Sequence, residues 1–213
     1  MDVRFLDQDV AAALRALAEG LVIGVPTDTV YGLAVDPSRE GATQRLFALK
    51  GRPEDTELPV LVDGIPQAEE LSESGFSSSA RTLATGWWPG ALTLVVRRRQ
   101  GVDWPLGGTG KTIGLRCPRH DGIRLLCGLA GPLAVTSANR HGEVPLTTAA
   151  AVRDAFGAGV ALVLDGGTCA GIASTVVDLT GDQPRCLREG GVPWRDLKDV
   201  LGIGEDRTRR EER

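Results

Sequence analysis

The segment LVIGVPTDTVYG, residues 21–32, joins a short apolar run to a polar turn. Residues 21–26 are rich in β-branched side chains, which is typical of a buried strand. Helical periodicity precedes this run at residues 9–19, where Gly20 occupies the position of a helix-terminating glycine, and follows it at residues 38–50. A buried strand between two amphipathic helices predicts an α/β fold.

The same alternation of apolar runs and helical patterns continues along the chain. Further strands are expected at residues 58–62, 91–98, 112–117, 132–137, 160–165, 174–179 and 185–189. Further helices are expected at residues 66–86, where a Ser-rich stretch breaks the pattern in two, and at 121–131, 147–157 and 193–202. Consecutive strands late in the chain favour a mixed sheet. We expect one domain over residues 1–200 and a charged, flexible tail over residues 201–213.

Three helix starts carry candidate capping side chains, and Asp7 or Asp9 is expected to cap the helix at residues 9–19. Ser38 is expected to cap the helix at residues 38–50, because a serine oxygen accepts a hydrogen bond from a first-turn amide. Thr147 or Thr148 is expected to do the same for the helix at residues 147–157.

The composition excludes several classes of protein. The net charge is −4 over 213 residues, so no overall positive field attracts nucleic acid, and contact with tRNA or double-stranded RNA would need a local patch such as Arg97–Arg99. The four cysteines form no C-x-x-C pair, which excludes a zinc ribbon or a disulfide framework. No apolar run approaches the roughly 20 residues that cross a membrane, and no signal peptide opens the chain. We therefore expect a cytoplasmic protein with no membrane partner.

The string GGTGKT, residues 107–112, looks like a phosphate-binding P-loop but fails the test of spacing. The motif G-x-x-x-x-G-K-[ST] requires a glycine at the position of Pro105. A P-loop lysine also opens a helix, whereas Lys111 is followed by the strand pattern TIGLRC. We interpret the segment as a glycine-rich loop that enters a strand.

Polar side chains gather where the predicted strands end, which is where α/β sheets commonly bind ligands. Each of them taken alone could serve only as a turn or helix-end residue. Together they supply several cations and hydroxyls without a metal-ligand cluster, a set that suits a polyphosphate and a small polar substrate. The cluster comprises Thr27, Asp28, Thr29, Tyr31, Lys50, Arg52, Arg116, Thr136, Ser137, Asn139, Ser174, Thr175 and Arg188.

Seven motifs occur in an order that resembles the YrdC/TsaC family of threonylcarbamoyl-AMP synthases. They are PTDTVYGLAVD (26–36), KGRP (50–53), WWPGALTLVV (87–96), GLRCP (114–118), TSANRHGE (136–143), STVVD (174–178) and LREG (187–190). The resemblance spans residues 8–195 and indicates the short, single-domain form. It implies a twisted mixed sheet flanked by helices, with a wide concave substrate cavity.

The resemblance also implies a reaction. L-Threonine, bicarbonate and ATP would give threonylcarbamoyl-AMP and pyrophosphate, and the tRNA threonylcarbamoyl transferase machinery would use the product to form N6-threonylcarbamoyladenosine in tRNA. The attacking groups belong to the substrates, so the enzyme supplies positioning and charge stabilisation. This agrees with the absence of a G-x-S-x-G motif or an H-E-x-x-H motif from the sequence.

The resemblance implies a role for individual residues. Lys50 and Arg52 match positions that stabilise charge during adenylyl transfer. The positions that match threonine contacts are Thr29, Leu61, Arg116, Ser137 and Ser174. The positions that match ATP contacts are Arg52, Thr56, Thr112, Asn139, Thr147 and Arg188. No residue is expected to bind a metal directly, because Mg²⁺ would come with ATP and be held mainly by phosphates and water.

One position departs from the family pattern. After KGRP the family continues with a Pro-Leu pair, and Glu57 stands here in place of the proline. An acidic side chain there could weaken ATP binding, help to hold Mg²⁺ or point to solvent. Two other functions stay open, namely an RNA-binding module without catalysis and a paralogue with another carbamoyl or acyl substrate.

Overall fold

A nine-stranded mixed sheet runs through the part of the chain that the computed structural model describes, which is residues 5–51, 55–140 and 142–203. The strands are β1 (Ile23–Val25), β2 (Gly32–Val35), β3 (Val60–Leu61), β4 (Leu92–Arg97), β5 (Thr112–Arg116), β6 (Leu133–Ser137), β7 (Leu162–Val163), β8 (Thr175–Asp178) and β9 (Arg185–Arg188). Their order across the sheet is β7-β1-β2-β6-β3-β5-β4-β8-β9, with parallel and antiparallel pairs. The predicted α/β fold with a mixed sheet is confirmed.

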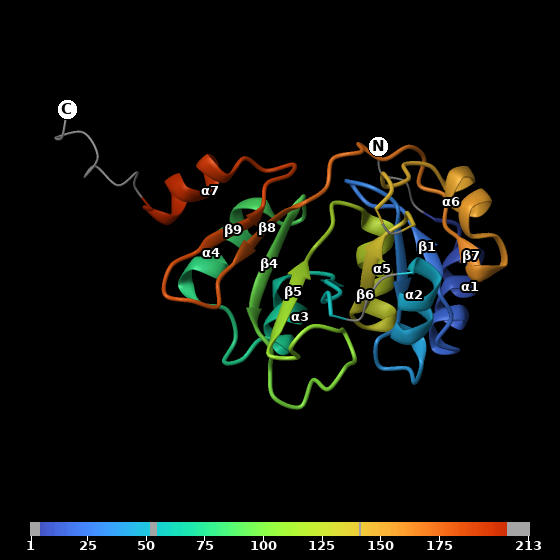
Figure 1. Ribbon diagram of the computed structural model, residues 1–213, viewed down its shortest axis with the longest axis horizontal. Helices are drawn as coiled ribbons and strands as arrows, with labels where there is room; N and C mark the ends of the chain where they lie inside the picture. Colours follow the sequence, from blue (N-terminus) through green and yellow to red (C-terminus); the bar gives the residue numbers. More distant parts are fainter. Residues whose placement is uncertain (1–4, 52–54, 141, 204–213) are drawn as a thin grey trace.

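Helices flank both ends of this sheet (Figure 1). They are α1 (Asp7–Ala18), α2 (Ala42–Lys50), α3 (Ile65–Leu71), α4 (Ser78–Trp87), α5 (Asp121–Ala130), α6 (Ala149–Phe156) and α7 (Trp194–Leu201), with a 3₁₀ turn at Gly157–Gly159. In Figure 1, α4 and α7 lie with β4, β8 and β9, whereas α1, α2, α5 and α6 lie with β1, β6 and β7.

Each strand except β2 lies within an apolar run that predicted a strand. β2 was missed because it is four residues long and half of it is glycine and alanine, which have weak strand preference. Antiparallel pairing with β1 on one side and β6 on the other holds it in the sheet. Tertiary pairing therefore decides this strand.

The capping predictions have mixed outcomes. Thr148 caps α6, since its hydroxyl accepts a hydrogen bond from the Ala151 amide at 3.3 Å. The prediction for Ser38 was wrong, because its amide and hydroxyl both bond the Asp36 carboxylate, at 2.9 and 2.6 Å. Because residues 36–38 form this turn, the helix begins later than predicted, at Ala42 after Gly41.

The buried side chains form two clusters on opposite faces of the sheet. Alternate residues of β2 show the division, since Leu33 and Val35 belong to one cluster and Ala34 belongs to the other. The first cluster includes Leu46 of α2, and the second includes Leu17 of α1. Both faces of this part of the sheet are therefore covered, and polar side chains can line a cavity only where the helices leave the sheet open.

Strand register brings distant motifs side by side. Gly32 lies opposite Ser137 across β2 and β6, and Leu61 lies beside Arg116 across β3 and β5. Near the other edge of the sheet, Val176 lies opposite Arg188 across β8 and β9. Residues up to about a hundred positions apart in the sequence thus meet around one region of the sheet.

Candidate active site

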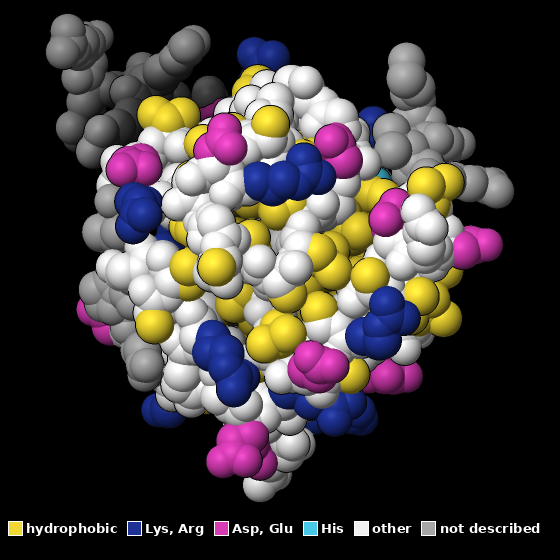
Figure 2. All heavy atoms as spheres, turned by 90° about the vertical axis from the view of Figure 1, so that its right-hand side faces the viewer, with side chains coloured by type: hydrophobic (Ala, Val, Ile, Leu, Met, Phe, Trp, Pro, Cys, Tyr) yellow, Lys and Arg dark blue, Asp and Glu magenta, His cyan; other side chains and the backbone are white. Residues whose placement is uncertain are grey.

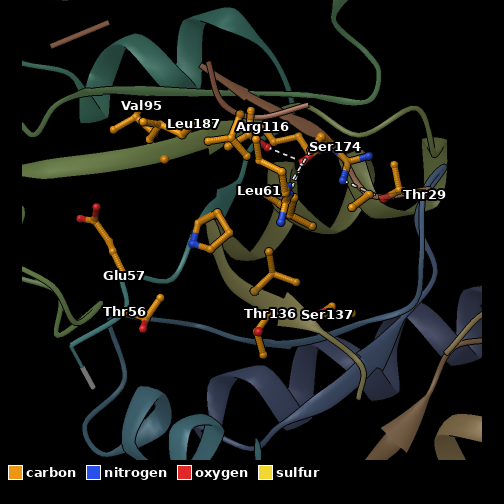
Figure 3. A pocket seen from close by; sticks show the side chains of 18 of the residues that line it. Thr29, Thr56, Glu57, Leu61, Val95, Arg116, Thr136, Ser137, Ser174 and Leu187 are labelled. Atoms are coloured by element: carbon orange, nitrogen blue, oxygen red, sulfur yellow. Dashed lines mark hydrogen bonds between the residues drawn. The ribbon is translucent and has the colours of Figure 1, made fainter. Parts of the chain in front are cut away.

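A cavity of about 650 Å³ lies over the middle of the sheet, within the size range of small-molecule sites. Its walls come from the turn after β1 and from β3, β4, β5, β6, β8 and β9. In Figure 3, Thr29, Arg116 and Ser174 lie together at one end, whereas Thr56 and Glu57 lie at the other. The predicted site residues that line it are Thr29, Thr56, Leu61, Thr112, Arg116, Ser137, Ser174 and Arg188.

Arg116 places a buried positive charge at one end of the cavity. Its guanidinium donates to the carbonyl of Gly90 at 3.0 Å, to the Thr29 hydroxyl at 2.9 Å and to the Asp28 carboxylate at 2.7 Å. Burial lowers the pKa of Arg116, and the Asp28 charge acts in the opposite direction. Three fixed partners hold the guanidinium in one orientation, which suits recognition of a substrate carboxylate.

Two hydroxyl groups and a second guanidinium also line the cavity at the Arg116 end. The hydroxyl groups of Ser174 and Thr93 lie 2.9 Å apart, and Arg188 donates to the Ser174 hydroxyl at 3.2 Å. Behind them the buried hydroxyl of Thr175 donates to the carbonyl of Val192 and accepts from the amide of Gly190. A side chain at Gly190 would come within 2.2 Å of a neighbouring carbonyl oxygen, so the chain approaches β8 closely there.

Lys50 lies behind the cavity wall. Its side chain is 5% exposed, and Nζ donates to the Ser137 carbonyl at 2.6 Å, to the Ser137 hydroxyl at 3.1 Å and to Asn139 Oδ1 at 2.7 Å. The Ser137 hydroxyl also lies 2.6 Å from Asn139 Oδ1. The structure thus brings together three predicted residues in one hydrogen-bonded cluster, in which Ser137 faces the cavity.

The other predicted residues lie at the far end of the cavity or away from it. Thr56 and Thr112 line the far end beside Glu57. Thr147 is not among the lining residues, and its carbonyl accepts a hydrogen bond from the Cys169 amide at 2.9 Å. Arg52 lies outside the described residues.

Asp28 lies in the polar turn after β1, where its residue type predicted no role beyond a turn. Its carboxylate accepts from Arg116 and from the Arg119 amide at 3.0 Å, and its side chain is 16% exposed. An acidic residue in a turn gives no signal of a partner 88 positions away. Asp28 therefore fixes the guanidinium that faces the cavity, a role that only the fold reveals.

We expect Asp28→Asn to raise the KM for a carboxylate substrate about tenfold and to lower the free energy of unfolding by about 3 kcal/mol, because one charge of a buried pair is removed. Steady-state kinetics and urea unfolding would measure the two effects. Asp121→Asn is the control, since Asp121 pairs with Arg124 at the surface and its loss should cost under about 1 kcal/mol. Equal effects of both variants would contradict the role given to Asp28.

The described residues offer no protein-built metal site. No group of three or more His, Cys, Asp or Glu side chains is close enough to hold a metal ion in these ranges. The four cysteines are free thiols, and burial raises the pKa of Cys117 to about 11. No helix of the described ranges has the length and apolar character that crossing a membrane requires.

Known proteins of similar sequence cover most of this chain. A protein of Mycobacterium tuberculosis (strain H37Rv) is 40% identical over 195 residues, which cover 91% of this chain and 89% of that protein. The threonylcarbamoyl-AMP synthase of Pyrococcus abyssi is 35% identical over 201 residues, which cover 93% of this chain and 59% of that protein. Relatives such as the latter are longer than this chain.

Solved structures of related proteins share the fold of this chain. The crystal structure of P. abyssi Sua5 complexed with L-threonine superposes with a TM-score of 0.89 at 34% identity, over 95% of this chain and 60% of that one. Escherichia coli YciO shares the fold with a TM-score of 0.82 at 24% identity, over 92% of this chain and 100% of that one. The Sua5/YciO/YrdC family model, described as "Telomere recombination", matches residues 15–190. The chain therefore belongs to the Sua5/YciO/YrdC family.

Proposed function

We propose that this protein is a threonylcarbamoyl-AMP synthase that uses L-threonine, bicarbonate and ATP. The observation that carries the proposal is the buried Arg116, held by Asp28 and Thr29 at one end of a cavity large enough for an amino acid and a nucleotide. Family relatives bear the name of this activity, and one related structure contains L-threonine. The enzyme would act as a nucleotidyltransferase, because an adenylyl group moves to the carbamate of threonine.

The reaction divides into two steps that need no protein nucleophile. The threonine amine adds to the carbon of bicarbonate, and loss of water gives a carbamate. A carbamate oxygen then attacks the α-phosphorus of ATP, a new P–O bond forms, and the bond to pyrophosphate breaks. The protein supplies orientation and compensates the negative charge that develops on the phosphate oxygens.

The cavity divides the substrates between its two ends. Arg116 would pair with the threonine carboxylate, and the hydroxyl groups of Thr29 and Ser174 would bind its polar groups. Leu61 would form an apolar wall beside Arg116. The Lys50 cluster lies behind the cavity wall, where Ser137 would bind threonine and Asn139 would contact ATP. Arg188, beside Ser174, would also contact ATP, and Arg52 would stabilise charge on the phosphates.

ATP would extend from this wall towards Thr56 and Thr112 at the far end. Thr147, just before α6, would make a further contact with ATP. Mg²⁺ would arrive with the nucleotide and be held by phosphates and water, which fits a lining without a cluster of acidic side chains. The protein would act in the cytoplasm, together with ATP, threonine and the tRNA-modifying machinery that would consume the product.

An RNA-binding module is the second candidate, and charge distribution argues against it. Figure 2 shows one face of the molecule, on which Lys and Arg side chains are separated by acidic and hydrophobic side chains. Such a face lacks the continuous basic surface that phosphate-backbone binding requires. A local contact with tRNA or double-stranded RNA remains compatible with the synthase. The third candidate, a paralogue with another acyl or carbamoyl substrate, would share the cavity and differ at its threonine end.

Pyrophosphate release by the purified protein tests the proposal. We expect release that requires ATP, bicarbonate and threonine together, with serine and valine as the comparison amino acids. Release that continues without threonine or without bicarbonate would contradict the synthase and favour the paralogue. A salt-dependent shift of tRNA by protein that releases no pyrophosphate would favour the RNA-binding module.

A further inference from the structure

The glycine-rich segment that imitates a P-loop packs against the far end of the cavity. Gly108 adopts a φ of +64°, and a β-carbon added there would lie 3.1 Å from the β-carbon of Glu57. The amide of Leu58 donates to the carbonyl of Leu106 at 2.8 Å, which ties the segment to the chain beside Glu57. A glycine at position 108 thus lets the segment cover the stem of the Glu57 side chain.

Glu57 remains a residue of the cavity wall, with its Oε1 atom buried and its Oε2 atom beside Thr112. Glu57 lines the cavity between Thr56 and Thr112, and its Oε2 accepts a hydrogen bond from the Thr112 hydroxyl at 2.8 Å. Burial raises the pKa of Glu57, while the Thr112 hydrogen bond and the charge of Arg98 act in the opposite direction. The Thr112 hydroxyl therefore fixes the orientation of the Glu57 carboxylate, which lies at the end of the cavity away from Arg116 (Figure 3). A second lining carboxylate, Asp178, is paired with Arg185.

Charge decides what such a carboxylate can contact in bound ATP. Two negative groups in close contact repel each other, so Glu57 disfavours direct contact with the phosphates. A carboxylate accepts hydrogen bonds only, and the donors of ATP are the ribose hydroxyl groups and the exocyclic amine of adenine. Acidic side chains bind ribose hydroxyl groups in this way in dinucleotide-binding folds.

We propose that Glu57 is a specificity-determining residue that reads the hydrogen-bond donors of the nucleoside part of ATP. The proposal rests on the proposed function, since it requires ATP to occupy the end of the cavity that Thr56 and Thr112 line. Glu57 stands where the family pattern has proline, which has no acceptor in its side chain. This chain therefore selects its nucleotide with a group that the family pattern does not supply.

The experiment compares ATP with three analogues that each lack or invert one donor. They are 2′-deoxy-ATP, 3′-deoxy-ATP and inosine triphosphate, and the full-length wild type, Glu57→Gln and Glu57→Ala would be tested. Equilibrium binding would be measured for every nucleotide, together with the KM and kcat of threonine-dependent pyrophosphate release. We expect the wild type to bind at least one analogue about tenfold more weakly than ATP, the effect of one lost hydrogen bond to a charged group.

Glu57→Ala should bring the affinities for ATP and that analogue to within about threefold of each other, with the KM for threonine unchanged. Glu57→Gln, which keeps one carbonyl acceptor, should retain part of the discrimination. Asp103→Asn is the control, because Asp103 is exposed, belongs to the segment between β4 and β5 that packs against Glu57 and does not line the cavity. Thermal unfolding of each variant would show that it is folded.

Two results would overturn the proposal. In one, Glu57→Ala keeps the wild-type ratio of affinities for all analogues. In the other, both variants bind every nucleotide more tightly by the same factor, which would mean that Glu57 only repels the phosphates. Nucleotide binding tests Glu57 even if pyrophosphate release proves independent of threonine, so failure of this proposal and failure of the proposed function are distinguishable.

Discussion

Arg116→Met is expected to lower kcat/KM for threonine by about 10²-fold or more, because the substrate carboxylate loses its charged hydrogen-bond partner. Steady-state pyrophosphate release at varied threonine concentration would measure the change. The KM for ATP should change less, since Arg116 lies opposite the end that Thr56 and Glu57 line. The variant should also lose about 3–5 kcal/mol of stability, because the Asp28 carboxylate remains buried without its cation.

A double variant separates binding from folding. Asp28→Asn combined with Arg116→Met removes both charges, so the free energy of unfolding should recover relative to Arg116→Met alone. Activity with threonine should stay as low as in the single variant, because the guanidinium is still missing. Recovery of activity together with stability would show that Arg116 acts only as a structural residue. Near-normal kcat/KM in the folded single variant would remove it from the site.

Lys50→Met is expected to depress kcat by about 10²-fold or more, the scale of losing one group that stabilises charge in the transition state. The methionine removes the donor that holds the Ser137 carbonyl, the Ser137 hydroxyl and Asn139 Oδ1. Turnover at saturating ATP and threonine would measure the effect. Arg52→Ala, at the neighbouring predicted position, should reduce turnover on the same scale.

Lys111→Met is the matched control for Lys50→Met. Lys111 belongs to the glycine-rich segment, its side chain is exposed, and it does not line the cavity. Its replacement should leave kcat within about twofold of the wild type, as surface substitutions usually do. Ser137→Ala provides a graded comparison, because it removes one of the three acceptors. Equal turnover of Lys50→Met and Lys111→Met would exclude Lys50 from the mechanism.

Periodicity in the sequence predicted most of the fold because each element carries its own signal. Apolar runs such as residues 21–26 and 132–137 indicate strands that are buried on both faces, and β1 and β6 lie within them. Gly20 ends α1 in the left-handed conformation that its position predicted, with a φ of +69°. The errors fall on β2, which pairs with a strand distant in the sequence, and on two helix starts. Leu6 precedes α1 without a side-chain cap, and Ser38 bonds its near neighbour Asp36 instead of capping α2.

The motifs also predicted which residues share the cavity, and their pattern assigned Arg116, Thr29 and Ser174 to one ligand. That prediction was possible because hydroxyl and cationic side chains followed the strands, and strand ends meet at one place in a sheet. The position of Lys50 behind Ser137 was not predictable in this way, because a lysine at the end of a helix gives no indication of what its ammonium will contact. Glu57 departs from the family pattern, but the sequence could not distinguish whether its side chain weakens ATP binding, helps to hold Mg²⁺ or points to solvent.

The sequence by itself determined the element types, the family and the chemical character of the site, since these follow from local periodicity and from residue types at fixed spacing. Only the tertiary structure decided that Asp28 holds Arg116 and that the false P-loop covers the stem of Glu57. Such pairings join segments about 50 to 90 residues apart in the chain. They depend on strand register and loop packing, which are properties of the whole sheet and which no single segment encodes.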